Sequence, residues 1–209
     1  MEDADPFLAE PADTREAIMQ ATYRALCEHG YAGLTISRIA EDFSKSKSLL
    51  YHHYESKDEL LLDFLAFMLE RFQAAVPEGR TDPPEERLEA VLETSLSADE
   101  DGPDLEFLRA MTELRAQAAH DERFRDHFKT HDRVFRETLV EIGEDGIESG
   151  VFRDVDAEQV ATFLFATLAG GMNQQATAET GAETETLAEL RWYVDHRLLA
   201  ADAQKTYPD

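Results

Sequence analysis

The stretch of residues 14–61 reads TREAIMQATYRALCEHGYAGLTISRIAEDFSKSKSLLYHHYESKDELL. Its apolar residues recur every three or four positions, which is the spacing of one face of an α-helix. Asp13 with Glu16, and Ser56 with Glu59, are pairs that can accept hydrogen bonds from the free amides of a first helical turn. We therefore expect helices to begin at both points, the second of them long.

Between these two starts the sequence predicts two further short helices. Gly30 is expected to end the first helix, since glycine favours the left-handed conformation found at helix ends. Thr35 and Ser46 can each cap a following turn, so we expect one helix from about Thr35 to Phe43 and another over residues 46–54. Three short helices thus lead into a long one.

The rest of the chain continues the helical pattern. The segment PEGRTDPPEE, residues 77–86, interrupts it, because proline and glycine do not continue a helix interior. Five more stretches beyond that segment carry apolar residues at helical spacing, and no segment sustains an alternation of apolar and polar residues. The sequence therefore predicts an all-α fold of about nine helices.

The charge of the chain is strongly acidic. Twenty Lys and Arg residues stand against 45 Asp and Glu residues, a formal net charge of -25 at pH 7, and the carboxylates are spread along the whole sequence. Such a charge would ordinarily repel nucleic acid. Dispersed acidity instead indicates a protein of an extreme halophile, because in molar salt the Debye length falls to about 3 Å and distant carboxylates no longer oppose a local phosphate contact.

Several protein classes are disfavoured by what the sequence lacks. Cys27 is the single cysteine, so disulfides and thiolate metal sites are not expected. No run approaches the ~20 apolar residues that span a bilayer, and the acidic start does not resemble a signal peptide. We expect a cytoplasmic protein with no membrane partner and no cofactor.

A helix-turn-helix is predicted within residues 37–54, SRIAEDFSKSKSLLYHHY. Ile39, Ala40 and Leu50 would hold two short helices together, and polar residues would remain at the outward end of the second helix, where recognition helices contact base edges. Local charge supports this interpretation, since the cations outnumber the anions here. The cations are Arg38, Lys45, Lys47 and Lys57, and the anions are Glu41, Asp42 and Glu55.

Residues 14–61 resemble the N-terminal region of TetR-family repressors in order, spacing and residue type. The matching positions are Ile18, Ala21, Gly30, Tyr31, Thr35, Ile39, Ala40, Leu50, Tyr51, Tyr54, Lys57 and Leu60. The resemblance implies that Thr35, Tyr51 and Lys57 contact the DNA backbone and that Lys47, Ser48 and His52 lie near bases. The full set of candidate DNA-binding residues is Thr35, Lys45, Ser46, Lys47, Ser48, Tyr51, His52 and Lys57.

The sequence departs from the family pattern in the turn. The family usually has glycine where this chain has Ser44 and Ser48, and a small apolar residue where it has Lys45. The helix-turn-helix geometry and the operator sequence are therefore not transferred from relatives.

The resemblance also implies a domain organisation and two partners besides double-stranded DNA. We expect an acidic disordered tail over residues 1–13, the helix-turn-helix domain over 14–58, a helical ligand-binding and dimerisation domain over 59–203, and a tail over 204–209. A homodimer would place two helix-turn-helix units on a two-fold symmetric operator. The candidate interface residues are Phe163, Thr167, Leu187, Leu190, Val194 and Leu198, unless these stripes face only their own core.

A small-molecule effector is the second implied partner, and its identity stays open. Aromatic and methionine residues of the middle helices are candidates for an apolar pocket, with plain core packing as the alternative for each. They are Met68, Phe72, Phe107, Met111, Phe124, Phe128, Phe135 and Phe163. His127 and His131 lie four residues apart, but we expect no metal there.

Two other functions remain as alternatives. A helical enzyme with paired carboxylates lacks support, because the chain has no phosphate-binding glycine loop, no HExxH and no GxSxG motif. A helix-turn-helix activator differs from a repressor only in where its operator lies. The sequence therefore predicts a DNA-binding transcriptional regulator, a repressor released by an effector, and not an enzyme.

Overall fold

The structure is a computed structural model that describes residues 10–43, 47–75, 82–96, 105–178 and 181–200. Within these ranges the chain forms nine α-helices and one π-helical turn, and its only β-type pairing is an isolated bridge between Phe152 and Leu199. The predicted all-α fold is confirmed. The chain divides into two compact units, one of Met1–Val76 with Arg109–Phe128 and one of Pro77–Leu108 with Lys129–Asp209.

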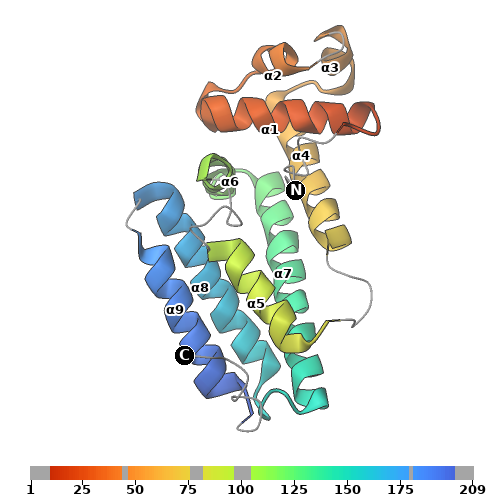
Figure 1. Ribbon diagram of the computed structural model, residues 1–209. Helices are drawn as coiled ribbons and strands as arrows, with labels where there is room; N and C mark the ends of the chain where they lie inside the picture. Colours follow the sequence, from red (N-terminus) through yellow and green to blue (C-terminus); the bar gives the residue numbers. More distant parts are fainter. Residues whose placement is uncertain (1–9, 44–46, 76–81, 97–104, 179–180, 201–209) are drawn as a thin grey trace. The chain divides into compact units, whose positions relative to one another are not determined.

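The first unit contains α1 (Thr14–Gly33), α2 (Ile36–Asp42), α3 (Lys47–His53) and α4 (Lys57–Ala75) (Figure 1). α1 packs against α2 and α4, and α2 packs against α3. The predicted helix starts are present as capping bonds, since the Asp13 carboxylate accepts from the Glu16 amide at 2.8 Å and Ser56 Oγ accepts from the Glu59 amide at 3.2 Å. Local capping therefore determines where α1 and α4 begin.

α1 does not end at Gly30 as expected. Gly30 has φ +62°, which interrupts the helix, but a last turn continues to Gly33, and the Leu34 amide donates to the Gly30 carbonyl at 3.1 Å. A Cβ on residue 30 would also lie 2.9 Å from the Glu113 carboxylate. The positive φ is the reason why this position favours glycine, since the Glu113 carboxylate is the end of a flexible side chain and can shift.

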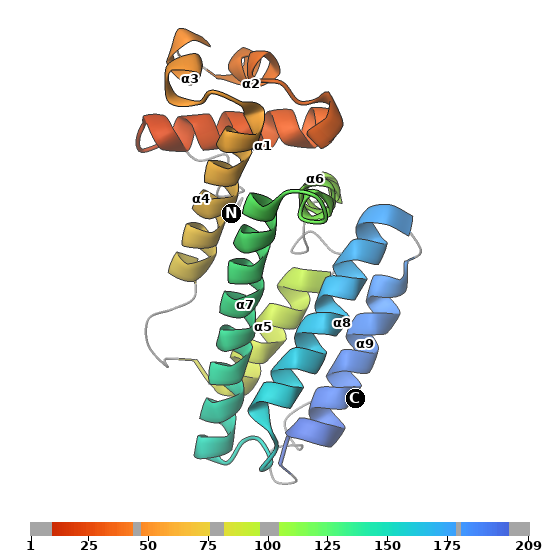
Figure 2. The same cartoon turned by 180° about the vertical axis from the view of Figure 1, so that it is seen from behind.

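The second unit contains α5 (Pro84–Leu96), α8 (Ala157–Ala178), α9 (Ala182–Tyr193) and the π-helical turn η1 (Val194–Leu198). α5, α8 and α9 lie side by side in both views (Figures 1 and 2) and pack pairwise. Leucine dominates the core of this unit. Its buried leucines are Leu88, Leu92, Leu96, Leu139, Leu164, Leu168, Leu187, Leu190, Leu198 and Leu199.

Two helices belong to both units. α6 (Leu105–Gln117) and α7 (Glu122–Ser149) each begin in one unit and continue into the other. α7 begins at a cap, because the Asp121 carboxylate accepts from the Arg123 amide at 2.8 Å. Each of these helices is therefore a continuous covalent link between the two units.

The last helix differs from the prediction at its end. The apolar spacing through Leu198 predicts α-helix, but α9 ends at Tyr193 and the following turn is π-helical. The chain there pairs with the segment that follows α7, since the Arg153 amide donates to the Leu198 carbonyl at 2.7 Å and the Ala200 amide to the Val151 carbonyl at 2.9 Å. These bonds compete with regular helical bonding and end the helix.

Among the helices in the described ranges, none combines the length and the apolar character needed to cross a membrane.

Candidate nucleic-acid interface

α2 and α3 form the two short helices of the predicted helix-turn-helix. Thr35 caps α2, with its Oγ1 accepting from the Arg38 amide at 3.2 Å, and Ile36 and Ile39 bury the inner side of that helix. Leu50 is the one α3 residue that is buried, at 0% exposure. Most of α3 is therefore available to a ligand, as a recognition helix requires.

Ser37 on α2 holds two candidate DNA-binding side chains of α3. Lys47 Nζ donates to Ser37 Oγ at 2.8 Å, and the same oxygen lies 3.2 Å from the Tyr51 hydroxyl. The Lys47 ammonium also lies 5.9 Å from the centre of the Tyr51 ring, and Tyr51 is 52% exposed. Lys47 and Tyr51 are thus positioned together on an exposed surface, which we call the Tyr51 face (Ser37, Lys47, Tyr51).

Sequence reasoning missed Ser37. The signal was available, because Ser37 is the second residue of α2 and stands on the side opposite Ile39. A hydroxyl at that position can reach the second helix of a helix-turn-helix. Without the register of α2 against α3, however, the sequence does not show which α3 side chains it meets.

The other predicted residues of α3 are exposed as well. Ser48 and His52 are both exposed, and the His52 ring lies edge-on to His53 with 5.6 Å between ring centres. Lys45 and Ser46, like the turn residue Ser44, lie outside the described residues. Of the candidate DNA-binding residues on α3, Lys47, Ser48, Tyr51 and His52 are therefore exposed in the structure.

Lys57, which was predicted to contact the DNA backbone, contacts another residue of the protein in this structure. Its Nζ donates to the Tyr31 carbonyl at 2.8 Å and lies 4.1 Å from the centre of the Tyr31 ring. The Tyr31 hydroxyl donates to Asp58 at 3.1 Å, and burial together with this bond raises the pKa of Tyr31. The lysine at the start of α4 is thus engaged with the end of α1.

A network of charged groups joins α1 to α4 just behind α3. Tyr54 follows α3 and donates from its hydroxyl to Asp63 at 2.5 Å, and Arg15 donates to the other oxygen of Asp63 at 2.8 Å. Burial and the Asp63 bond raise the pKa of Tyr54. Burial alone would raise the pKa of Asp63, but the bonds from Arg15 and Tyr54 outweigh it and lower that pKa. We call Arg15, Tyr54 and Asp63 the Asp63 network.

Comparisons with known proteins identify both parts of the chain. The sequence profile described as bacterial regulatory proteins, tetR family, matches residues 18–64, which include the Tyr51 face and, from the Asp63 network, Tyr54 and Asp63. A second profile, for the C-terminal part of BetI-type transcriptional repressors, matches residues 84–199.

The chain belongs to the TetR family.

Relatives of known name agree with the family. The transcriptional repressor AcnR of Corynebacterium glutamicum is 28% identical over 182 residues, which are 87% of this chain and 90% of AcnR. A TetR transcription regulator from Haloarcula marismortui is 39% identical with a TM-score of 0.79, covering 89% of this chain and 98% of that one. A regulator from Saccharomonospora viridis in complex with choline has a TM-score of 0.74 at 22% identity, covering 89% and 97%. The protein is therefore a DNA-binding TetR-family regulator and not an enzyme.

TetR-family regulators dimerise, and the predicted interface residues of this chain lie on α8, on α9 and in the π-helical turn η1. Leu187, Leu190 and Leu198 are between 2% and 7% exposed and belong to the leucine core of the second unit. They have little surface left for a second chain, and their part in an interface stays a prediction. The alternative, packing in their own core, describes them.

An exposed aromatic surface lies beside that core. Phe163 is 46% exposed, Trp192 is 54% exposed, and the Phe163 ring lies 4.8 Å from that of Tyr193. Together with Thr167 they line a groove of about 360 Å³ between α8 and α9. We call Phe163, Thr167, Trp192 and Tyr193 the Trp192 face. Phe163 and Thr167 were predicted, and Trp192 was missed.

The predicted pocket residues are divided between the units. Met68, Met111, Phe124 and Phe128 lie in the first unit and Phe107, Phe135 and Phe163 in the second, while the side chain of Phe72 lies outside the described residues. Phe124 and Phe128 are buried, at 1% and 4% exposure. These two side chains therefore pack in the core of the first unit, which was the alternative to lining a pocket.

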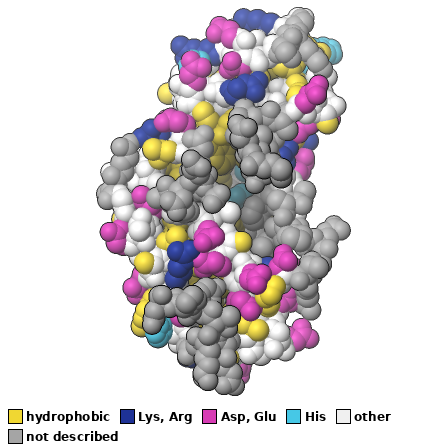
Figure 3. Space-filling view, viewed as in Figure 1, with side chains coloured by type: hydrophobic (Ala, Val, Ile, Leu, Met, Phe, Trp, Pro, Cys, Tyr) yellow, Lys and Arg dark blue, Asp and Glu magenta, His cyan; other side chains and the backbone are white. Residues whose placement is uncertain are grey.

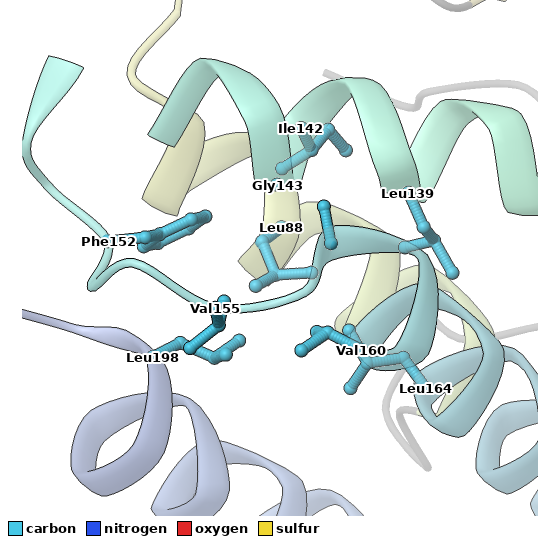
Figure 4. A pocket seen from close by; sticks show the side chains of 10 residues that line it. Leu88, Leu139, Ile142, Gly143, Phe152, Val155, Val160, Leu164 and Leu198 are labelled. Atoms are coloured by element: carbon cyan, nitrogen blue, oxygen red, sulfur yellow. The ribbon is translucent and has the colours of Figure 1, made fainter. Parts of the chain in front are cut away.

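The second unit has a small cavity in its leucine core (Figure 4). Side chains of α5, α7, α8 and η1 converge on it, among them Leu88, Ile142, Leu164 and Leu198, and it holds about 10 Å³. That is about the space of one water molecule, so this cavity does not hold a drug-sized ligand in this conformation.

The paired histidines of α7 have other neighbours. His127 lies edge-on to Phe128, and His131 Nδ1 lies 3.3 Å from Asp132. Among the described residues, no three His, Cys, Asp or Glu side chains gather closely enough to hold a metal ion.

Proposed function

We propose that this TetR-family regulator is a homodimeric repressor, acting in the cytoplasm, that binds a two-fold symmetric operator and is released from it by a small-molecule effector. The observation that carries the DNA part is the Tyr51 face. A lysine and a tyrosine project from a helix with one buried residue, and a serine of the preceding helix positions both. Lysine and phenol groups of this kind bind phosphate and base edges.

The dimer is supported by the composition of α8. Residues 159–178 contain no Asp, Glu, Lys or Arg, in a chain whose residues are 31% charged. The exposed positions among them are Gln159, Thr162, Phe163, Ala166, Gly170, Asn173, Gln174, Thr177 and Ala178. Interface cores are depleted in charge and enriched in aromatic residues, which fits the Trp192 face. A two-fold axis through this surface would place α8 and α9 of two copies together as four helices.

Operation in molar salt is supported by the surface charge. Carboxylates are scattered over the face shown in Figure 3 and do not gather in one patch. With a net charge of -25, the chain repels DNA at long range in dilute buffer, whereas molar salt screens that repulsion. The 39% identical Haloarcula marismortui regulator is consistent with such an environment.

For the effector we propose a small organic cation, with choline as the first probe. The support is the BetI-type match of the C-terminal part and the choline complex of the Saccharomonospora viridis regulator. In the second unit, Phe135 lies 5.6 Å from Phe165 and 6.4 Å from His131, both as ring-centre distances. Rings at these distances pack against one another, so a quaternary ammonium group would bind on an outer face of this cluster or after the rings separate. Phe135 was among the predicted pocket residues.

Selection of genomic DNA fragments by the purified protein in molar KCl tests the function. We expect the retained fragments to share a two-fold symmetric sequence. Choline, added to the complex, is then expected to weaken binding of that sequence, with Na⁺ at equal concentration as the control. A folded protein that enriches no sequence would contradict the proposal. Enrichment without a response to choline would contradict the effector class alone.

A further inference from the structure

Tyr31 is contacted by charged side chains of two other helices. It follows Gly30, whose φ of +62° breaks α1, so its amide is directed away from the regular helical bond to residue 27. Glu113 of α6 accepts that amide at 2.5 Å, although it is 82 residues away in sequence. Lys57 of α4 donates to the Tyr31 carbonyl at 2.8 Å. We call Tyr31, Lys57 and Glu113 the Tyr31 junction.

The polarity of the junction matches the peptide groups that it binds. A carboxylate accepts the amide hydrogen, and an ammonium donates to the carbonyl oxygen of the same residue. Hydrogen bonds to ionised groups are stronger than those between neutral groups. The junction therefore holds the backbone at the point where the chain leaves α1 and enters the turn to α2, whose cap Thr35 is four residues further on.

The position of this turn determines the position of the Tyr51 face. α2 packs on α1 and on α3, and Ser37 of α2 holds Lys47 and Tyr51. A shift at Tyr31 would move α2 and, with it, Ser37. Glu113 belongs to α6, a continuous helix whose first residues belong to the second unit. A displacement of α6 along or about its axis would withdraw the carboxylate from the Tyr31 amide.

We propose that Glu113 is a positioning residue for DNA binding, through which α6 controls the helix-turn-helix at the Tyr31 junction. This inference rests on the proposed function, since it names the contact that a regulatory movement of α6 would break. Glu113 does not touch DNA in this account. It acts through a hydrogen bond to the backbone, so the length of its side chain matters more than its charge.

Two substitutions separate length from charge. Glu113→Asp keeps the charge but removes one methylene, so the carboxylate no longer reaches the amide. Glu113→Gln removes the charge but keeps an oxygen at the same distance. The quantities to be measured are the operator affinity in molar KCl and the rate of hydrogen exchange of the Tyr31 amide. Glu113→Asp is expected to bind the operator about tenfold more weakly and to exchange Tyr31 faster, whereas Glu113→Gln stays within about threefold of the wild type.

Three results would overturn the proposal. Glu113→Asp with wild-type affinity would show that the junction does not control DNA binding. A larger loss in Glu113→Gln than in Glu113→Asp would show that the charge is responsible and not the length of the side chain. Unchanged Tyr31 exchange in Glu113→Asp would show that the bond is absent in solution. This last readout needs no DNA, so it tests the junction even if the wild type enriches no operator and the proposed function fails.

Discussion

The Tyr51 face and the Trp192 face both expose an aromatic ring, but their surroundings differ. Tyr51 stands beside a lysine and a serine, on a helix followed by Tyr54 of the Asp63 network. Trp192 stands beside Phe163 and Tyr193, on helices held by a leucine core and next to the charge-free segment 159–178. Exposure alone does not indicate a partner. The neighbours of the exposed ring do, since cationic and hydroxyl neighbours favour DNA and uncharged neighbours favour a second copy.

The largest expected effect comes from Trp192→Asp. A carboxylate at the centre of a two-fold interface would face its own copy, and burying two like charges is strongly unfavourable. We expect the mass in solution to fall from twice 23.6 kDa to 23.6 kDa, measured by light scattering in molar KCl. Ala119→Asp, which adds the same charge on an exposed residue outside α8 and α9, should leave the dimer intact. A Trp192→Asp protein that stays dimeric would remove the Trp192 face from the interface.

Lys47→Ala tests whether the Tyr51 face specifies sequence. Lysine near base edges contributes to discrimination, so the substitution is expected to weaken operator binding about tenfold and to alter the preferred sequence. Selection of random DNA by the variant measures both effects. An unchanged preference with uniformly weaker binding would mean that Lys47 contacts phosphate only.

Lys57→Ala is expected to have a smaller and uniform effect. Its ammonium bonds the Tyr31 carbonyl, so its loss loosens the Tyr31 junction and lowers affinity for all sequences alike, by about fivefold. Competition between the operator and unrelated DNA measures this ratio. A change of sequence preference would contradict the placement of Lys57 away from bases.

Tyr51→Phe isolates the phenol hydroxyl of the Tyr51 face. The ring and its packing remain, but the bond to Ser37 and any hydroxyl contact to phosphate are lost, so we expect about threefold weaker binding. Ser37→Ala should weaken binding at least as much, because Lys47 and Tyr51 both lose their common partner. A Ser37→Ala protein with full affinity would show that this bond does not position the face.

Asp63→Asn is expected to change how the stability of the protein depends on pH without changing its dimerisation. The folded-state pKa of Asp63 is lowered, so its contribution to stability is present above the unfolded-state value and is lost as pH falls through the folded-state value. Melting of the wild type is therefore expected to drop below about pH 4, and the variant should show a flatter profile. Dimer mass, which depends on the Trp192 face, should not change between them at pH 7. Identical acid profiles would exclude Asp63 as the titrating group.

Local features of the fold were predictable from sequence because they depend on neighbours in the chain. Thr35 caps α2, Ser56 caps α4 and Leu50 is buried, each as its position in a short motif indicates. Contacts between distant residues were not predictable. Nothing near Gly30 in sequence points to Glu113, and the local sequence of Lys57, which was expected to contact the DNA backbone, does not reveal Tyr31.

The interface side of α9 shows a second limit of sequence analysis. Apolar residues occur on both sides of this helix, so periodicity alone does not decide which side meets its own core. Leu187 and Leu190 have the stronger apolar spacing, and the structure buries them in the chain itself. Trp192 lies outside that stripe and is exposed. Only the packing of α5 against α8 and α9 distinguishes the two sides.

The separation of the two faces is tested most directly by comparing the wild type and Trp192→Asp on two DNA fragments, the full symmetric operator and one isolated half-site, in molar KCl. If the Tyr51 face binds DNA and the Trp192 face forms the dimer, we expect both proteins to bind the half-site equally. We expect Trp192→Asp to bind the full operator about a hundredfold more weakly than the wild type. A variant that loses the half-site as well, or one that binds the full operator as the wild type does, would contradict this assignment of the two faces.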